Sequence, residues 1–403
     1  MSRGHPRSDP HKTLRACNAN LLCAAANNPY VFYPTALNTS AFQGVPVSLV
    51  LTIVNTLRPS LSHLQEVVDF GTNPGALRML TYVPDDLPTK PALVVVLHGS
   101  TQSAARYDLG TGWSKLADRH GFALLMPEQS RQNNLSGSFN WFQRNDTQRG
   151  GGEAHSIVQM VEQMVRDHDI DRRRIFVTGL SAGGAMTLAM LASYPDVFAA
   201  GAVIAGLPYG SATNAREALR SMFQAPPRSS LELGNLVREA SPNRSAWPKL
   251  SVWHGSADRT VKPSNASEII KQWLDVHGLP LTPMSEQIVD GHSREVWWNA
   301  DGETVIESYT IAGMAHGIPL APSEGGVVGP FMIEAGISSS DHIAKFFGLT
   351  KTLAESTKSQ RPVPILSALR KATRPHRIRA VRVWRDVSAI ITRALIVVGL
   401  MER

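Results

Sequence analysis

The chain has 403 residues, of which 43% are hydrophobic and 18% are charged, which is the usage of an ordinary globular protein. This composition excludes a disordered chain, a collagen-like repeat and a disulfide scaffold. The two cysteines, Cys17 and Cys23, are too few for a four-thiolate zinc site or an iron–sulfur cluster. If they pair with each other, they close one small loop.

The net charge of the chain is +7, but the positive charge is not spread evenly. Residues 351–403 hold 12 basic and 3 acidic side chains, a balance of +9, whereas the rest of the chain has a balance of −2. A nucleic-acid-binding domain would need its positive charge on the folded body itself. We therefore expect no nucleic-acid partner.

The chain divides into three predicted parts. They are an N-terminal arm over 1–63 that is partly disordered, a folded body over 64–350, and a basic linker with a C-terminal helix over 351–403. The arm faintly resembles a signal peptide, but asparagines interrupt its short apolar stretch, and a flexible arm is the alternative. No apolar run reaches the roughly 20 residues that a membrane-spanning helix needs.

Short apolar runs alternate with amphipathic stretches from about Leu64, which is typical of an α/β fold. Continuous apolar runs predict strands that are buried on both faces, and apolar residues three or four apart predict helices packed on the sheet. We therefore expect a mostly parallel central sheet with helices on both faces. In chain order, the predicted elements are a strand over Ala92–Leu97, a helix over Trp113–His120, a strand over Phe122–Met126, a helix over Ala154–His168, a strand over Ile175–Thr178, a helix over Ala182–Tyr194, and strands over Ala200–Ala205, Leu250–His254 and Val305–Ile311.

Two segments do not fit this alternation. Residues 207–249 form a long connection between two strands, and we expect an insertion over one edge of the sheet that forms part of a substrate cleft. Residues 376–403 have apolar side chains every three or four positions with arginines on the other faces. Such a helix can lie on an anionic membrane or granule surface; the alternative is packing on the body or on a second subunit.

The strongest chemical signal is the sequence Gly179-Leu180-Ser181-Ala182-Gly183, which lies between a predicted strand and a predicted helix. A sharp turn in this context lifts the serine hydroxyl above the end of the sheet, and glycines are required where a Cβ would collide with neighbouring backbone. The helix N-terminus also stabilises negative charge near the serine. Ser181 is therefore the predicted nucleophile; the alternative is a structural turn.

A serine hydroxyl needs a base and an orienting carboxylate to become a nucleophile. In this fold class the order along the chain is serine, acid, histidine, each on a loop after a strand. Asp258 and His316 meet this requirement, since each stands just past a predicted strand. We expect surface or capping roles for the competing residues, which are His254, Asp290, His292, Asp341 and His342.

The oxyanion formed during acyl transfer needs two backbone N–H donors. One belongs to the residue after the nucleophile, Ala182, and the second comes from the loop after an earlier strand. That loop is His98-Gly99-Ser100-Thr101-Gln102, so we expect Ser100 to supply the second donor. The alternative for Ser100 is an ordinary turn residue.

Taken together, these motifs resemble the poly(3-hydroxybutyrate) depolymerase family of α/β-hydrolase esterases, which is related to feruloyl and acetylxylan esterases. The resemblance covers about Leu64 to Leu320, roughly two thirds of the chain. It is carried, in order, by Phe70-Gly71-Thr72-Asn73-Pro74-Gly75, LVVVLHGSTQ (93–102), Pro127-Glu128-Gln129, Asn140-Trp141-Phe142, Arg149-Gly150-Gly151-Gly152-Glu153, GLSAGGAM (179–186), Gly206-Leu207-Pro208-Tyr209-Gly210 and WHGSADRTV (253–261).

The resemblance implies an α/β-hydrolase catalytic domain over 64–350 and a triad of Ser181, Asp258 and His316, with no metal or organic cofactor. It places Trp141 near the ester-binding cleft, and we expect His98 and Gln102 to contact substrate as well. Two departures are visible: Ser100 replaces the cysteine usual in the family, and 317–320 replaces a segment that often carries tryptophan.

The substrate implied is a polyhydroxyalkanoate or its oligomers. The alternatives are a feruloyl or acetyl ester on plant polysaccharide and, in another class, a non-catalytic surface-binding protein. The resemblance implies an extracellular enzyme; a cytoplasmic one is the alternative, because the signal-peptide pattern is weak.

Overall fold

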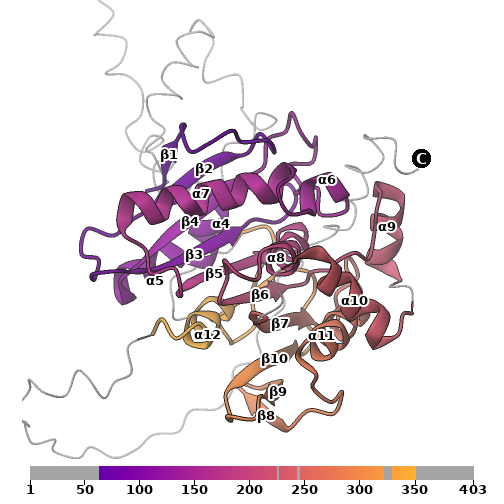
Figure 1. The fold of residues 1–403 in the computed structure, drawn as a ribbon. Coiled ribbons are helices and arrows are strands. Elements are labelled where there is room, and N and C mark those ends of the chain that lie inside the picture. The colour runs from indigo at the N-terminus through magenta and orange to yellow at the C-terminus, as the bar shows by residue number, and fades with distance from the viewer. Residues whose placement is uncertain (1–62, 225–226, 243–245, 322–328, 351–403) are drawn as a thin grey trace, which may run out of the picture. The chain divides into compact units, whose positions relative to one another are not determined.

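The computed structural model describes residues 63–350 except for 225–226, 243–245 and 322–328 (Figure 1). The predicted arm, the cysteine pair and the basic helix over 376–403 lie outside the described residues. What we expect of them remains a prediction.

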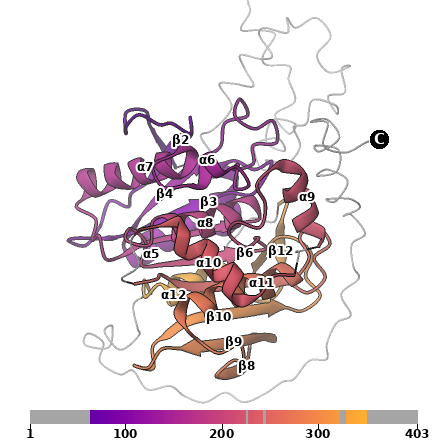
Figure 2. The ribbon, with the colours of Figure 1, turned by 45° about the vertical axis from the view of Figure 1, so that its right-hand side comes forward.

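A ten-stranded sheet has the strand order β1-β2-β4-β3-β5-β6-β7-β10-β9-β8. The strands from β4 to β10 in this order run parallel, and the two strands beyond each end are antiparallel. Figure 2 shows β10, β9 and β8 following one another at one end. The strands are β1 (Gln65–Val67), β2 (Arg78–Tyr82), β3 (Ala92–Leu97), β4 (Phe122–Glu128), β5 (Ile175–Leu180), β6 (Ala200–Ile204), β7 (Lys249–Gly255), β8 (Ser285–Val289), β9 (His292–Trp298) and β10 (Thr304–Ile311), with a separate parallel pair β11 (Ile318–Leu320) and β12 (Met332–Glu334).

Helices cover both faces of the sheet because the central strands are apolar on both sides. In β3, Leu93 and Val95 belong to one buried cluster with α7, α8, α10 and α11, whereas Val94 and Val96 belong to a second cluster with α4, α5 and α12. Burying one such side chain stabilises the fold by roughly 1.5–3 kcal/mol. The helices are α4 (Ala104–Thr111), α5 (Trp113–His120), α6 (Arg144–Thr147), α7 (Gly152–His168), α8 (Ala182–Ser193), α9 (Ala215–Phe223), α10 (Ser230–Ala240), α11 (Ser264–His277) and α12 (Ser339–Phe346).

The elements predicted from the sequence are confirmed. The predicted strands correspond to β3, β4, β5, β6, β7 and β10, and the predicted helices to α5, α7 and α8. The mostly parallel sheet with helices on both faces is therefore the architecture that the alternation of apolar runs predicts.

The segment 207–249 lies differently from the expectation. It forms α9 and α10, and α10 packs on α11 and α8, which cover a face of the sheet, rather than beside an edge strand, β1 or β8. The reason is the apolar side of α10, where Leu233 and Val237 are buried. The N-terminal end of α10 carries a capping box, in which the Glu232 N–H donates to Ser229 Oγ and the Ser229 N–H donates to Glu232 Oε2.

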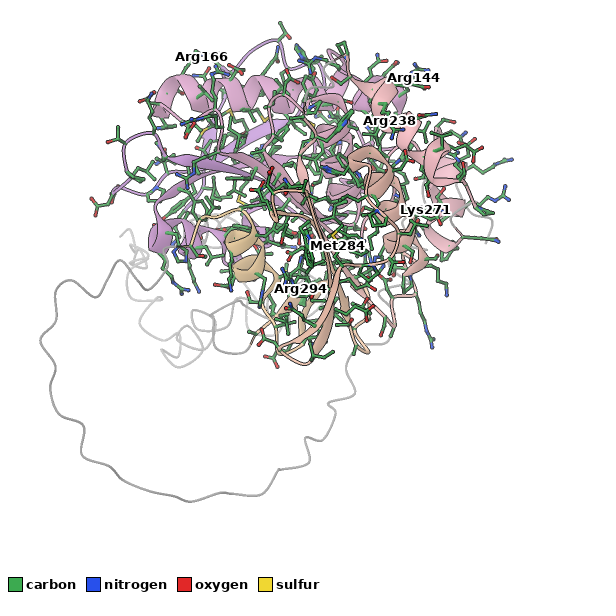
Figure 3. All side chains as sticks on the ribbon, turned by 60° about the horizontal axis from the view of Figure 1, so that its bottom comes forward. Arg144, Arg166, Arg238, Lys271, Met284 and Arg294 are labelled. Atoms are coloured by element: carbon green, nitrogen blue, oxygen red, sulfur yellow. The ribbon has the colours of Figure 1, made fainter. Side chains whose placement is uncertain are left out.

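A buried carboxylate ties three strands together near the antiparallel end of the sheet. Glu307 Oε1 accepts a hydrogen bond from Ser251 Oγ at 2.7 Å. Glu307 Oε2 accepts from Nε and Nη2 of Arg294, which is labelled in Figure 3, at 2.9 and 2.8 Å. Because these residues belong to β7, β9 and β10, the contacts fix the strands whose ends carry two of the predicted site residues.

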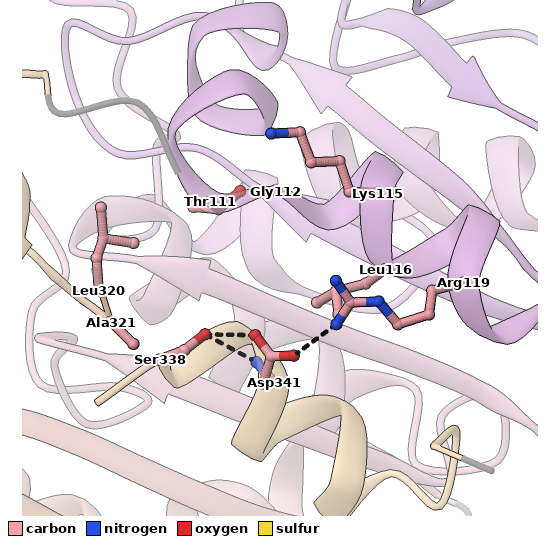
Figure 4. A pocket seen from close by; sticks show the side chains of 9 residues that line it. All are labelled: Thr111, Gly112, Lys115, Leu116, Arg119, Leu320, Ala321, Ser338 and Asp341. Atoms are coloured by element: carbon pink, nitrogen blue, oxygen red, sulfur yellow. Dashed lines mark hydrogen bonds and ion pairs between the residues drawn. The ribbon is translucent and has the colours of Figure 1, made fainter. Parts of the chain in front are cut away.

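A shallow hollow lies between α5 and α12 (Figure 4). Its walls carry the ion pair between Arg119 and Asp341 at 3.7 Å, and Ser338 Oγ caps α12 by accepting from the Asp341 N–H. None of the predicted site residues lines it. Among the described residues, no helix has the length and apolar character needed to cross a membrane.

Candidate active site

Ser181 occupies a sharp turn between β5 and α8. Its φ is +56° and its ψ is −114°, a conformation that residues other than glycine rarely adopt. The turn is held on both sides, because the Ser181 N–H donates to Ile204 O at 2.8 Å and the Ser181 carbonyl accepts from Ala185 N at 2.9 Å. Such strain at an N-terminal helix end is typical of a functional serine.

The two glycines that flank Ser181 are required by space. A Cβ on Gly179 would lie 2.5 Å from backbone atoms of Gly183. A Cβ on Gly183 would lie 2.3 Å from the carbonyl oxygen of Leu97 and 2.6 Å from that of His98. The absence of a Cβ at both glycines of the motif is therefore what allows α8 to pack closely on the end of β3.

Gly183→Ala is expected to destabilise the protein by roughly 1–3 kcal/mol or more, because the added Cβ meets backbone that cannot rotate away. Thermal unfolding measures this, and esterase activity should fall with it. Gly110→Ala is the matched control, since the atoms nearest to a Cβ there belong to the flexible side chain of Met332. Equal stability of the two variants would contradict the packing argument.

Asp258 and His316 come together at the ends of two neighbouring parallel strands, β7 and β10. His316 Nδ1 lies 2.7 Å from Asp258 Oδ2. The other carboxylate oxygen, Oδ1, accepts from the N–H groups of Thr260 and Val261 at 2.8 and 3.0 Å. With 2% and 5% of their surfaces exposed, Asp258 and His316 form an oriented and almost fully buried pair.

The surroundings of Asp258 favour its ionised form. Burial alone would raise the pKa of Asp258, but hydrogen bonds from His254 and His316 outweigh it and hold the pKa well below its ordinary value. An ionised Asp258 can only accept in its contact with His316, so His316 Nδ1 is the donor. Because the pKa of Asp258 is lowered in the folded protein, its ionised carboxylate stabilises the fold above the pKa that it has in the unfolded chain. This stabilisation is lost as the pH falls through the pKa of the folded protein.

His254, for which a surface or capping role was expected, is buried and contacts Asp258. Its Nε2 lies 3.3 Å from Asp258 Oδ2 and 2.9 Å from the carbonyl oxygen of Val261, and the ring is buried. The ring of His254 therefore helps to orient the carboxylate of Asp258. The sequence feature that indicates this contact is the position of His254 near the end of the strand whose following loop carries Asp258.

One small cavity joins the predicted nucleophile to the predicted base. Ser181 and His316 line it together with Ser100, and the remaining walls come from Gly99, Leu180 and Phe331. No hydrogen bond joins the Ser181 hydroxyl to His316 in the described part of the chain; in the absence of substrate such bonds are often long. Over the same residues, no hydrogen bond uses the backbone N–H of Ser100 or Ala182, so both are available to a ligand.

His98 and Gln102, which we expect to contact substrate, both make hydrogen bonds inside the protein. His98 Nε2 accepts from the Gln129 N–H at 3.1 Å, and its Nδ1 contacts Gly99 O at 2.8 Å. Gln102 Oε1 accepts from the Gly99 N–H at 2.8 Å. Because buried loop backbone must find partners, these side chains hold the Gly99–Ser100 loop in place. Their expected contact with substrate stays a prediction.

Trp141 belongs to a small apolar cluster one helical turn beyond Ser181. It packs with Met222 of α9 against three buried residues, Ala185, Leu207 and Val261. Val261 lies three residues after Asp258, so this cluster connects Trp141 to the loop that carries Asp258. The placement near the cleft that the family resemblance implies for Trp141 is compatible with this cluster.

A buried carboxyl supports the loops around the site. Glu153, at the start of α7, accepts hydrogen bonds from Gln129 Nε2 and, at 2.9 Å, from the Asn140 N–H. Gln129 in turn contacts His98, and Asn140 precedes Trp141. Burial, followed by the negative charge of Asp146, raises the pKa of Glu153 to about 8.

The folded protein therefore retains a proton on Glu153 that the unfolded chain releases above a pKa of 4.5. Stability should fall by up to about 1.4 kcal/mol for each pH unit as the pH rises from this value toward about 8. Glu153→Gln cannot titrate and should show a flatter slope over this range in thermal unfolding, although it loses one accepting oxygen. Glu334→Gln, at an exposed position, is the control and should keep the wild-type slope; an unchanged slope in Glu153→Gln would contradict the assignment.

No group of three or more His, Cys, Asp or Glu residues is arranged to hold a metal ion in the described ranges.

Comparison with solved structures identifies the fold. An acetyl xylan esterase from Aspergillus awamori superposes with a TM-score of 0.61 at 25% identity, covering 72% of this chain and 100% of that chain. The sheet order, the helices on both faces and this likeness together show the α/β-hydrolase fold.

Comparison of sequences identifies the family. A family model described as esterase PHB depolymerase matches residues 79–294. Poly(3-hydroxyalkanoate) depolymerase C of Paucimonas lemoignei is 42% identical over 320 residues, which are 78% of this chain and 76% of that protein. Feruloyl esterase B of Thermothelomyces thermophilus is 36% identical over 63% of this chain and 88% of that protein, and acetylxylan esterase A of Emericella nidulans is 33% identical over 66% and 88%. The chain therefore belongs to the esterase PHB depolymerase family and is a carboxylic ester hydrolase.

Proposed function

We propose that this enzyme cleaves its ester in two steps through Ser181, Asp258 and His316, with an acyl-enzyme on Ser181. The observation that carries the proposal is the 2.7 Å contact between His316 Nδ1 and Asp258 Oδ2 beside a cavity that Ser181 also lines. This contact leaves the second imidazole nitrogen free for the serine proton.

In the first step, Ser181 Oγ attacks the ester carbonyl carbon while His316 Nε2 takes the hydroxyl proton. The bond between the carbonyl carbon and the alcohol oxygen then breaks, and His316 returns the proton to that oxygen. In the second step, water attacks the acyl-enzyme, with His316 again acting as base and then as acid. Asp258 stays ionised throughout and stabilises the imidazolium that forms.

The negative charge on the carbonyl oxygen is stabilised by backbone N–H groups. The N–H groups of Ser100 and Ala182 have no partner among the described residues. The Gly99–Ser100 loop is held by Gln102 and His98, so its donor is fixed before substrate arrives. Fixed donors of this kind lower the barrier because they need no reorganisation during the reaction. Ser100 replaces the cysteine that is usual in the family, but the donor is its backbone N–H, so the role does not depend on this side chain.

The substrate class proposed is polyhydroxyalkanoate or its oligomers. Support comes from the 42% identity to a poly(3-hydroxyalkanoate) depolymerase over most of both chains. The partly buried apolar side chains of Trp141 and Met222, which pack on Ala185 one helical turn after Ser181, suit an uncharged aliphatic polyester. Feruloyl or acetyl esters of plant polysaccharide are the second candidate, supported by the relatives that carry those names.

A substrate panel separates the candidates. Release of 3-hydroxybutyrate from polymer and oligomer, of ferulate from feruloylated xylan and of acetate from acetylated xylan would be measured with wild type and Ser181→Ala. We expect release of 3-hydroxybutyrate to be fastest in the wild type and to disappear in the variant. Faster release of ferulate or acetate would favour the second candidate, and release that persists in Ser181→Ala would contradict the mechanism.

A further inference from the structure

A second imidazole contacts the carboxylate of Asp258, and the proposed mechanism does not use it. Asp258 Oδ2 lies 2.7 Å from His316 Nδ1 and 3.3 Å from His254 Nε2. The other oxygen, Oδ1, accepts from the N–H groups of Thr260 and Val261. A carboxylate has about four lone-pair positions, so these contacts fill them, and two histidine rings share one oxygen.

The surroundings of His254 determine where its hydrogen lies. Its Nε2 is 2.9 Å from the carbonyl oxygen of Val261, which can only accept, so Nε2 carries a hydrogen. Its Nδ1 is buried and has no hydrogen-bond partner among the described residues, so a second hydrogen there would be buried without an acceptor. His254 is therefore a neutral ring with its hydrogen on Nε2, which donates toward Val261 and Asp258.

The loop after β7 fixes this ring and the carboxylate relative to each other. The Val261 N–H donates to Asp258 Oδ1, while the Val261 carbonyl accepts from His254 Nε2, so one residue holds both side chains. Gly255 lets the segment that leads to the proposed base approach closely, since a Cβ on it would lie 2.3 Å from Met314 O. The two rings and the carboxylate are thus held by backbone that has little room to rearrange.

The contact with His254 affects the proposed base through the shared oxygen. The positive end of the His254 N–H dipole lies beside Asp258 Oδ2, so it opposes the positive charge that His316 acquires when it is protonated. On the basis of the proposed function, we propose that His254 is a positioning residue that holds the Asp258 carboxylate and lowers the pH at which His316 becomes free to act as the base. The ring thereby extends ester hydrolysis to a lower pH.

The titratable groups that act on Asp258 in the described part of the chain are the rings of His254 and His316. The other residues that line the cavity with His316 carry no charge; they are Gly99, Ser100, Leu180, Ser181 and Phe331. Glu153 also titrates, but its carboxyl contacts Gln129 and Asn140, and it is unchanged in every variant compared below. A comparison of variants therefore isolates the effect of the His254 ring.

The test measures kcat/KM for a short-chain p-nitrophenyl ester against pH in wild type, His254→Leu and His254→Gln, because this profile reports the base of the free enzyme. His254→Leu removes the N–H, so the fall in activity at acidic pH should move to higher pH by roughly half a pH unit or more. Its kcat at the optimum should fall by on the order of 10-fold, with little change in KM, because the carboxylate is less restrained. His254→Gln places an amide N–H near the position of Nε2 and should restore the wild-type profile and most of kcat.

His277→Leu is the matched control. His277 Nε2 also contacts a backbone carbonyl, that of Pro248 at 3.1 Å, but the ring lies at the end of α11 and does not line the cavity. The substitution should leave the pH profile of kcat/KM unchanged. An unmoved profile in His254→Leu, an equal movement in His254→Gln, or an equal movement in His277→Leu would overturn the inference.

A second measurement uses the wild-type chain and does not depend on the folding of His254→Leu. NMR of isotope-labelled histidine nitrogens reports which ring nitrogen carries the hydrogen, and the His254 signals are those that vanish in His254→Gln. We expect the hydrogen of His254 on Nε2 throughout the pH range in which activity falls. A hydrogen on Nδ1 would overturn the inference, whereas a wild-type profile without a fall at acidic pH would contradict the proposed role of His316 as the base.

Discussion

Ser181→Ala is expected to lower kcat for a short-chain p-nitrophenyl ester by on the order of 10⁶. Without the hydroxyl no acyl-enzyme forms, so only the oxyanion donors and substrate binding remain to accelerate direct attack by water. The fold should persist, because the turn at Ser181 is held by its backbone hydrogen bonds with Ile204 and Ala185 rather than by the side chain. Steady-state kinetics with thermal unfolding as a companion measurement tests this.

Ser211→Ala is the matched control for that experiment. Ser211 is also buried, and its Oγ has no hydrogen-bond partner within the described residues. The same substitution there therefore removes a buried hydroxyl without breaking a hydrogen bond. Its activity should stay near that of the wild type. Comparable activity of Ser181→Ala and Ser211→Ala would remove Ser181 from the mechanism.

Asp258→Asn is expected to lower kcat by on the order of 10⁴. The N–H groups of Thr260 and Val261 point at Oδ1, so the asparagine oxygen must take that place and its amide NH₂ faces His316. His316 Nδ1 would then have to accept, which puts the hydrogen on Nε2, where it blocks removal of the serine proton. KM should change little, because Asp258 is buried behind His316.

Asp290→Asn provides a control of the same chemical kind. Asp290 also contacts a histidine, His342 Nε2 at 3.0 Å, but that pair does not line the catalytic cavity. Activity should therefore be close to that of the wild type. If Asp258→Asn lost no more activity than Asp290→Asn, another carboxylate would have to orient the base.

The central strands could be predicted from the sequence, and the outer ones could not. β3 and β4 are buried on both faces and read as continuous apolar runs such as Ala92–Leu97. β8 is exposed along most of its length and contains Glu286 and Gln287, so its sequence carries little periodic signal. Its pairing with β9 depends on the turn between them rather than on a buried face.

The residues of the candidate site also divide into those that a local sequence pattern predicts and those that it does not. The turn at Ser181 could be predicted because a local motif, a strand and a helix specify it, and the loop positions of Asp258 and His316 because each follows a predicted strand. The position of Phe331 depends on the pairing of β11 with β12 and on the approach of Gly317, which no local pattern predicts. The hydrogen bond of His98 Nε2 with the Gln129 N–H likewise depends on the fold, since no local pattern pairs the two residues.

The most direct test of the account is labelling with a fluorophosphonate, a reagent that reacts with activated serines, followed by intact mass and peptide mapping. We predict one adduct per chain, on Ser181, which is absent in Ser181→Ala and forms far more slowly in Asp258→Asn. Loss of ester hydrolysis should follow the fraction labelled. Full inactivation with Ser181 unmodified, or continued hydrolysis with Ser181 fully labelled, would contradict the assignment of Ser181 as the nucleophile.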